Sequence, residues 1–249
     1  MDTTATEKRN DFENGLEGEA GEKLHHVEIS KGALRAAARY VEKPKKGRSG
    51  RIIEGVCIYC DDEERGGVFA TDGYQAISVP ADPDDPPYLD GAQRLGTDIP
   101  CVVVSPKELK PVTQGTDAGT VAVDFDGQPG ELFRIASGSA FGEKVSISAA
   151  NMEGAAAYPN MAKLFKPSEE TQRVDAASFD PAYLATLSQA AKDLTRHRYP
   201  YPMLVWDRLS SQKHATHIAV KAERDLDSAT LADVLVMEIV HPVVVRPAR

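Results

Sequence analysis

Short apolar segments alternate with polar turns along most of the chain, and this pattern predicts many strands and few helices. The apolar segments are rich in Val, Ile and aromatic residues, which favour a pleated, half-buried surface. The segments that we predict as strands are 26–29, 51–60, 67–80, 100–104, 120–125, 132–136, 144–148, 173–176, 203–206, 215–222 and 233–240.

Three segments carry apolar residues at helical spacing instead. The first helix is predicted over 31–42, after Ser30 as its cap. Ser105 and Pro106 open a second helix, which Pro111 is expected to shorten or kink. The third helix is predicted over 181–196. The order of strand, helix and strands therefore occurs three times, which indicates an α+β architecture built by repetition.

The segment 1–24 does not fit this pattern. It is polar, rich in Gly and Glu, and almost without large apolar residues, so burial cannot offset the entropy of ordering it. We expect a disordered acidic tail, and a partner-binding or regulatory role is the alternative.

Composition and charge exclude several classes of protein. With 249 residues and 41% apolar residues the chain can build a buried core. The net charge of −9 argues against a nucleic-acid coat that depends on overall positive charge, although a local surface can still be basic. No apolar run approaches the ~20 residues that span a bilayer, and the N-terminus does not resemble a signal peptide. We expect a cytoplasmic protein with no membrane partner, and the three cysteines suit a reducing compartment.

Few residues suggest catalysis. Cys57 and Cys60 are spaced like metal ligands, but on a strand they point to opposite faces, which favours core cysteines over a zinc site. The acidic loop 61–64 could hold a cation or be a solvated hairpin loop. No phosphate-binding loop or nucleophile triad stands out. We expect no catalytic residue, no metal and no cofactor, and a metal-dependent enzyme is the weakest alternative.

The segment 68–80, VFATDGYQAISVP, has two interpretations. Asp72 and Gly73 favour a tight hairpin turn. The segment also resembles the Ala-Thr-Asp-Gly-His-Arg-Leu-Ala sequence in the middle domain of the bacterial β sliding clamp, the processivity ring of DNA polymerase III. Tyr74, Gln75 and Ala76 stand where that family has His, Arg and Leu.

Further fragments resemble the same family in the same order. Tyr158-Pro159-Asn160 occupies the position of Phe-Pro-Asp in that family, and Leu164 occupies the position of a valine. The segment 179–184 is similar to the Phe-Asn-x-x-Tyr helix opening, and 234–239 to the closing Tyr-Val-Val-Met-Pro-Met. The resemblance covers most of residues 25–242.

The resemblance implies a DNA-clamp fold of repeated βαβββ units, with antiparallel sheets outside and helices inside. Residues 25–150 are similar to the complete middle domain, with two units. A linker follows over 151–171. After it comes a partial domain over 172–249, with one unit that is similar to the second half of the family's last domain. The implied form is truncated, with three units where the usual subunit has six, so four chains would complete a ring of twelve units.

The function implied by the resemblance is that of a processivity factor that encircles duplex DNA without sequence specificity. A sliding ring must hold DNA through phosphates rather than bases. The basic residues on the predicted helices are therefore expected to face DNA, although an ordinary solvated face also explains them. They are Lys31, Arg35, Arg39, Lys107, Lys110, Lys192 and Arg196.

The second implied function is capture of short peptides from DNA polymerase and the clamp loader in a hydrophobic cleft. The residues at matching positions are Thr71, Gly73, Tyr74, Gln75, Ala76, Pro159, Leu164, Leu235, Met237 and Ile239. The last three also fit the alternating core residues of a strand. A clamp-fold adaptor or decoy that binds such peptides without encircling DNA is the alternative function, and a homo-oligomeric ring distinguishes the two.

Overall fold

The computed structural model describes residues 25–41, 55–61, 65–82, 99–114, 119–125, 132–137, 144–149, 180–195, 203–208, 215–221 and 230–237. For the strands over 144–149 and 203–208 the description covers the backbone only. The predicted tail 1–24, the linker 151–171 and the strand 173–176 lie outside the described residues.

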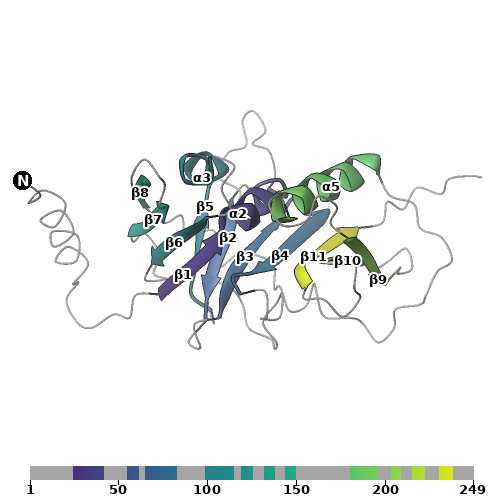
Figure 1. The fold of residues 1–249 in the computed structure, drawn as a ribbon, viewed down its shortest axis with the longest axis horizontal. Coiled ribbons are helices and arrows are strands. Elements are labelled where there is room, and N and C mark those ends of the chain that lie inside the picture. The colour runs from purple at the N-terminus through teal and green to yellow at the C-terminus, as the bar shows by residue number, and fades with distance from the viewer. Residues whose placement is uncertain are drawn as a thin grey trace, which may run out of the picture.

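The elements follow one another in three groups along the chain (Figure 1). The first group comprises β1 (His25–Ser30), α2 (Lys31–Ala37), β2 (Val56–Cys60), β3 (Gly66–Thr71) and β4 (Gln75–Pro80). The second group comprises β5 (Cys101–Val104), α3 (Pro106–Thr113), β6 (Thr120–Phe125), β7 (Leu132–Ser137) and β8 (Lys144–Ala149). The third group comprises α5 (Pro181–Thr195), β9 (Met203–Arg208), β10 (Ala215–Lys221) and β11 (Thr230–Met237).

The strands form two antiparallel sheets that link the groups. One sheet has the order β1-β6-β7-β8 and the other has the order β5-β2-β3-β4-β11-β10-β9. The first two groups exchange strands, because β1 pairs with β6 and β5 pairs with β2. The third group joins the first through β11, which pairs with β4. Helices α3, α2 and α5 lie in a row on one side of the strands (Figure 1).

Helix α2 begins as predicted and ends earlier. The Ser30 hydroxyl caps it by accepting a hydrogen bond of 3.0 Å from the Ala33 amide. The last turn then tightens, because the Tyr40 amide donates to the Ala37 carbonyl at 2.9 Å, three residues back. The Tyr40 side chain is buried in the core. The predicted extension to residue 42 is therefore wrong, because the regular helix ends at Ala37 and the chain continues in tighter turns.

The other helices agree more closely with the prediction. Ser105 and Glu108 form a reciprocal capping box at the start of α3, with Pro106 in its first turn. The helix contains Pro111 and has only 8 residues, which confirms that it is short. Helix α5 extends from Pro181 to Thr195, one residue short of the predicted end.

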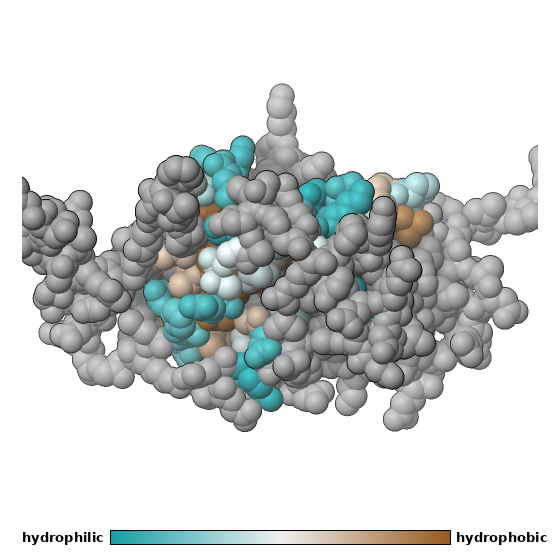
Figure 2. All heavy atoms as spheres, viewed as in Figure 1, coloured by the Kyte–Doolittle hydropathy of each residue, from teal (hydrophilic) through white to brown (hydrophobic). Residues whose placement is uncertain are grey.

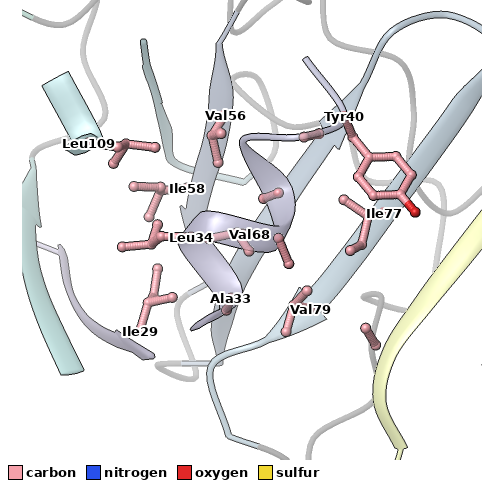
Figure 3. Packing of buried hydrophobic residues seen from close by; sticks show 14 of the residues in the cluster. Ile29, Ala33, Leu34, Tyr40, Val56, Ile58, Val68, Ile77, Val79 and Leu109 are labelled. Carbon is pink, nitrogen blue, oxygen red and sulfur yellow. The ribbon is translucent and has the colours of Figure 1, made fainter. Parts of the chain in front are cut away.

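The main core lies between the row of helices and the strands. Figure 3 shows Ala33 and Leu34 of α2 among aliphatic side chains of β2, β3 and β4, including Val68 and Ile77. Every residue of β2, β3 and β4 is buried, on both faces of the sheet. The first group is therefore the centre of the fold, with the second group on one side and the third on the other.

Candidate functional site

The row of helices carries several exposed basic side chains. Lys107 and Lys110 of α3 and Lys192 of α5 are exposed, and Arg39 after α2 has a side chain that is 41% exposed. Figure 2 shows hydrophilic patches at the upper edge of the molecule, where the helices lie, and further hydrophilic patches on the lower side. These four residues could contact an anionic surface that extends along the row. Arg196, which was predicted to join them, lies outside the described residues.

Two of the predicted DNA contacts are also used inside the protein. The Arg35 side chain, 16% exposed, donates from Nη1 to the Thr113 carbonyl at 2.9 Å, and its Nε lies 4.0 Å from Oδ1 of Asp193. Arg39 pairs with the same carboxylate. Arg35 therefore contacts residues of α3 and α5 from its place on α2, and links all three groups.

Lys31 does not contribute to an exposed basic surface. Its side chain is only 1% exposed, so the prediction that it faces DNA is not supported by its place in the structure. The spacing of Lys31, Arg35 and Arg39 correctly places them on one stripe, but α2 packs against α5 and α3 on its two sides. A basic stripe on a helix between two others is largely covered.

The segment with the family resemblance forms a hairpin turn between β3 and β4. Asp72 Oδ1 accepts hydrogen bonds from the amides of Tyr74 at 2.8 Å and Gln75 at 2.9 Å. The Thr71 hydroxyl donates to the Gln75 carbonyl at 2.8 Å. Gly73 has φ of 91°, and a Cβ placed there would meet no atom within 4 Å. The glycine is therefore needed for its backbone angle rather than for space.

The turn places some of the predicted cleft residues at a junction between the first and third groups. Tyr74 is 63% exposed, whereas Gln75 and Ala76 are buried. Ala76 is the register partner of Leu235 in β11. Met237, two residues further on, lies opposite Ala215 of β10. The backbone thus brings the start of β4 beside the end of β11, while Pro159, Leu164 and Ile239 lie outside the described residues.

Two tyrosines that were not predicted as site residues lie near the same turn. Burial raises the pKa of Tyr40 well above its usual value, and the negative charge of Asp72 raises it further. The pKa of Tyr183 on α5 is also raised, first by burial and then by the charges of Asp72, Asp180 and Tyr74. The charge of Asp72 therefore acts on both phenols. Tyr183 belongs to a fragment that resembles the β clamp, whereas the helix pattern around Tyr40 gives no such signal.

Two buried polar atoms of the first group have no hydrogen-bond partner. They are the Tyr40 hydroxyl oxygen and Oε1 of Gln75. The amide nitrogen of Gln75 donates to Oδ2 of Asp72 at 3.1 Å. A buried polar atom without a partner costs free energy, so each of these two residues carries an unsatisfied group.

The described residues hold no group of three or more His, Cys, Asp or Glu side chains arranged for a metal ion. Cys60 packs in the main core, while the Cys57 thiol lies beside that of Cys101 and is fully buried, which raises its pKa. In the described part of the chain no helix is both long and apolar enough to cross a membrane.

Comparison with solved structures shows that the fold is similar to that of known proteins. Neither a protein-family model nor a curated protein matches the sequence. The β clamp of Helicobacter pylori in complex with diflunisal matches with a TM-score of 0.54 and 9% identity, over 92% of this chain and 70% of that one. The same clamp bound to a DNA ligase peptide matches with a TM-score of 0.54 and 10% identity, over 90% of this chain and 68% of that one.

The β subunit of Streptococcus pyogenes DNA polymerase matches with a TM-score of 0.38 and 18% identity, over 88% of this chain and 51% of that one. The chain thus spans between about half and 70% of the length of these clamps. The Helicobacter pylori comparisons show that the described strands and helices have a clamp-like fold, with mixed helices and antiparallel sheets.

Proposed function

We propose that the protein is a processivity factor that encircles duplex DNA and tethers DNA polymerase to it. The observation that carries this proposal is the clamp-like fold together with a row of three helices that carries exposed basic residues. The three groups of elements then act as three repeat units, with the helices facing DNA and the sheets outside. The function has no catalytic step and needs no cofactor.

The distribution of charge supports binding of DNA without sequence specificity. Lys107, Lys110, Lys192 and Arg39 are exposed, and in this proposal they contact phosphates, which are the same for every DNA sequence. The net charge of −9 then belongs to the other surfaces and keeps them from binding DNA. Such a distribution allows sliding, because no base contact fixes the position.

Encirclement requires more than one copy of this chain. Among the described strands, β8 is one edge of the first sheet, opposite β1, and β9 is one edge of the second sheet, opposite β5. A strand at the edge of a sheet presents backbone groups that can pair with another chain. Pairing of β8 of one copy with β9 of the next would continue the sheets around a ring, and four copies with three units each would supply twelve units.

The junction of β4 and β11 is the proposed site for peptides of DNA polymerase and the clamp loader. The Helicobacter pylori clamp bound to a DNA ligase peptide supports the idea that this fold accepts peptides. In this chain the exposed Tyr74 and the neighbouring turn lie beside the end of β11. Leu235 and Met237 would complete the cleft, with Pro159, Leu164 and Ile239.

A clamp-fold adaptor or decoy that binds peptides but does not encircle DNA is the second candidate. The specific observation in its favour is that Arg35 and Arg39 contact groups of the protein itself and that Lys31 is buried. These contacts reduce the charge that the helices offer to DNA.

Retention on DNA distinguishes the two candidates. The protein would be incubated with primed circular DNA, with or without a clamp loader, and the retained fraction measured before and after the circle is linearised. We expect retention on the circle, release on linearisation, and loss of retention in the variant K107E/K110E/K192E. A fold control by circular dichroism accompanies the variant. A monomer without retention under every condition would reject the ring and favour the adaptor.

A further inference from the structure

An ion pair at the contact between α2 and α5 involves one of the exposed basic residues. Nε of Arg39 donates a hydrogen bond to Oδ2 of Asp193 at 2.5 Å. Nε of Arg35 lies 4.0 Å from the other oxygen of the same carboxylate. A guanidinium has five N–H donors, so this contact leaves the two terminal nitrogens of Arg39 for another acceptor. The carboxylate nevertheless lowers the positive charge that Arg39 offers to a ligand in solvent.

The two members of the pair differ in exposure. The Arg39 side chain is 41% exposed, whereas that of Asp193 is 10% exposed. An ion pair with an exposed member contributes little stability, because water screens its charges. A phosphate that approaches from solvent can therefore bind the remaining donors of Arg39, and it then competes with Asp193 for the same charge.

The surrounding contacts hold Asp193 and Arg35 in place. A Cβ at Gly32 of α2 would lie 2.5 Å from the backbone oxygen of Asp193, so the backbones of α2 and α5 approach closely at this point. Arg35 is 16% exposed, and its Nη1 donates to the Thr113 carbonyl at 2.9 Å. Of the two arginines that share the carboxylate, Arg39 is therefore the one that a phosphate can reach.

We propose that Asp193 competes with DNA phosphates for Arg39 and so weakens the binding of DNA by the row of helices. This inference rests on the DNA-binding function proposed above and adds the residue that limits its strength. A protein that slides must break each phosphate contact as it moves, so a weakened contact favours sliding. The exposed lysines of α3 and α5 then bind phosphates with their full charge, and Arg39 binds with only part of its charge.

The salt dependence of DNA binding tests the proposal. The probe is a fluorescent duplex of about 30 base pairs, and its dissociation constant is measured by anisotropy between about 50 and about 200 mM NaCl. D193N removes the negative charge but keeps an oxygen that accepts a hydrogen bond from Arg39. One full phosphate contact adds about 0.9 to the slope of log affinity against log salt. We expect D193N to steepen the slope by about 0.5–0.9 and to bind about threefold more tightly at the lowest salt.

A double-mutant cycle assigns this effect to Arg39. R39Q removes the positive charge and keeps N–H donors for Asp193. We expect R39Q to lower the affinity less than about twofold in the wild-type protein and about threefold in D193N. D193N should in turn have little effect in the R39Q protein. A gain from D193N that persists in R39Q would mean that Asp193 acts by general repulsion of DNA, and would overturn the competition.

The matched control for D193N is D61N. Asp61 pairs with Arg65 at nearly the same exposures, 11% and 41%, but the two residues belong to the β2–β3 hairpin rather than to the helices. D61N removes the same charge and is expected to leave the salt slope unchanged. An equal steepening by D61N and D193N would contradict a specific role for Asp193. Circular dichroism checks that each variant is folded.

A second comparison does not depend on the folding of D193N. K107Q removes an exposed charge from α3, and R39Q removes one beside Asp193. We expect K107Q to lower the affinity of the wild-type protein about threefold, more than R39Q does, because Arg39 already shares its charge with a carboxylate. A loss in R39Q as large as that in K107Q would overturn the proposal.

Retention on primed circular DNA separates this inference from the proposed function. Retention of the wild-type protein on the circle, with a salt slope that D193N leaves unchanged, would overturn the competition while the ring stands. The same holds if D193N does not bind the duplex at the lowest salt although the circle retains it. Absence of both duplex binding and retention in every protein would overturn the two proposals together.

Discussion

The guanidinium of Arg39, just after α2, lies with its Nε 2.5 Å from Oδ2 of Asp193 on α5. This ion pair joins the first and third groups, which also share the pairing of β4 with β11. Arg35 approaches the other oxygen of the same carboxylate at 4.0 Å. One acidic side chain therefore neutralises part of a basic stripe and fixes the contact between two helices.

Loss of this carboxylate should weaken the contact between the groups. We expect D193N to lower the free energy of unfolding by about 1–2 kcal/mol, because Asp193 is 10% exposed whereas Arg39 is 41% exposed and partly solvated. Urea denaturation measures the change, and hydrogen exchange should show faster exchange in α5.

The control for this variant is D61N. Asp61 pairs with Arg65 at nearly the same exposures, 11% and 41%, but both residues flank one hairpin. D61N is expected to leave exchange in α5 unchanged. Equal effects of the two variants on α5 would contradict a specific role for Asp193 between the groups.

Gly32 allows α5 to approach α2 closely. A Cβ at this position would lie 2.5 Å from the backbone oxygen of Asp193, which cannot move by a rotamer change. Alanine favours a helix over glycine by about 1 kcal/mol, but the clash should outweigh this gain. We expect G32A to destabilise the protein by about 1–3 kcal/mol, measured by urea denaturation. An increase in stability would show that α5 can move away without cost.

Gly73 should respond to substitution for a different reason. Its φ of 91° disfavours any side chain with a Cβ, although there is open space around it. We expect G73A to cost about 1–2 kcal/mol and G73N to cost less, because Asn tolerates positive φ better. Thermal unfolding compares the three proteins. A loss in G73N as large as that in G73A would argue against backbone strain as the cause.

Tyr40 should make the protein sensitive to alkali. Burial holds its folded-state pKa above the unfolded value of 10.0, so the folded state retains the proton more strongly. The stability that depends on this difference is fully present below about pH 10 and falls as pH rises further. We expect Y40F to reduce this fall, and to be stabilising by about 1 kcal/mol at neutral pH because it removes a buried hydroxyl without a partner.

Urea denaturation of both proteins between about pH 8 and about pH 11 checks this prediction. Burial also raises the pKa of Cys57, so this thiol adds a further loss of stability as pH rises. That loss is the same in both proteins. An identical pH dependence in the two proteins would reject the role of Tyr40.

Local signals in the sequence predicted where elements begin better than where they end. Ser30 and Ser105 mark helix starts because their hydroxyl groups meet nearby backbone amides, an interaction encoded within a few residues. The end of α2 at Ala37 has no such marker in the sequence, and Tyr40, three residues further on, is buried in the core. The start of β11 is an exception, because the strand begins at Thr230 and the alternating pattern indicated residue 233.

The candidate site was predictable only in part for the same reason. Asp72 and Gly73 predicted the turn, because their chemistry acts within it. The partnership of Arg39 with Asp193 depends on how helices from different groups pack, and periodicity gives only the residues that share a face. Periodicity does not tell which neighbouring helix covers that face. For this reason the sequence pattern predicts a DNA-facing Lys31, whereas the structure buries it.

The pairing of β4 with β11 also has a consequence for synthesis of the chain. Ala76 leaves the ribosome long before its register partner Leu235, and the whole second group is made between them. Until then one edge of the central sheet offers unpaired amides and carbonyls to any other strand in reach. Late closure of this edge makes folding depend on a contact between distant parts of the sequence, which is intrinsically slow. The interval before β11 arrives is therefore the period in which nascent chains are most prone to pair with one another.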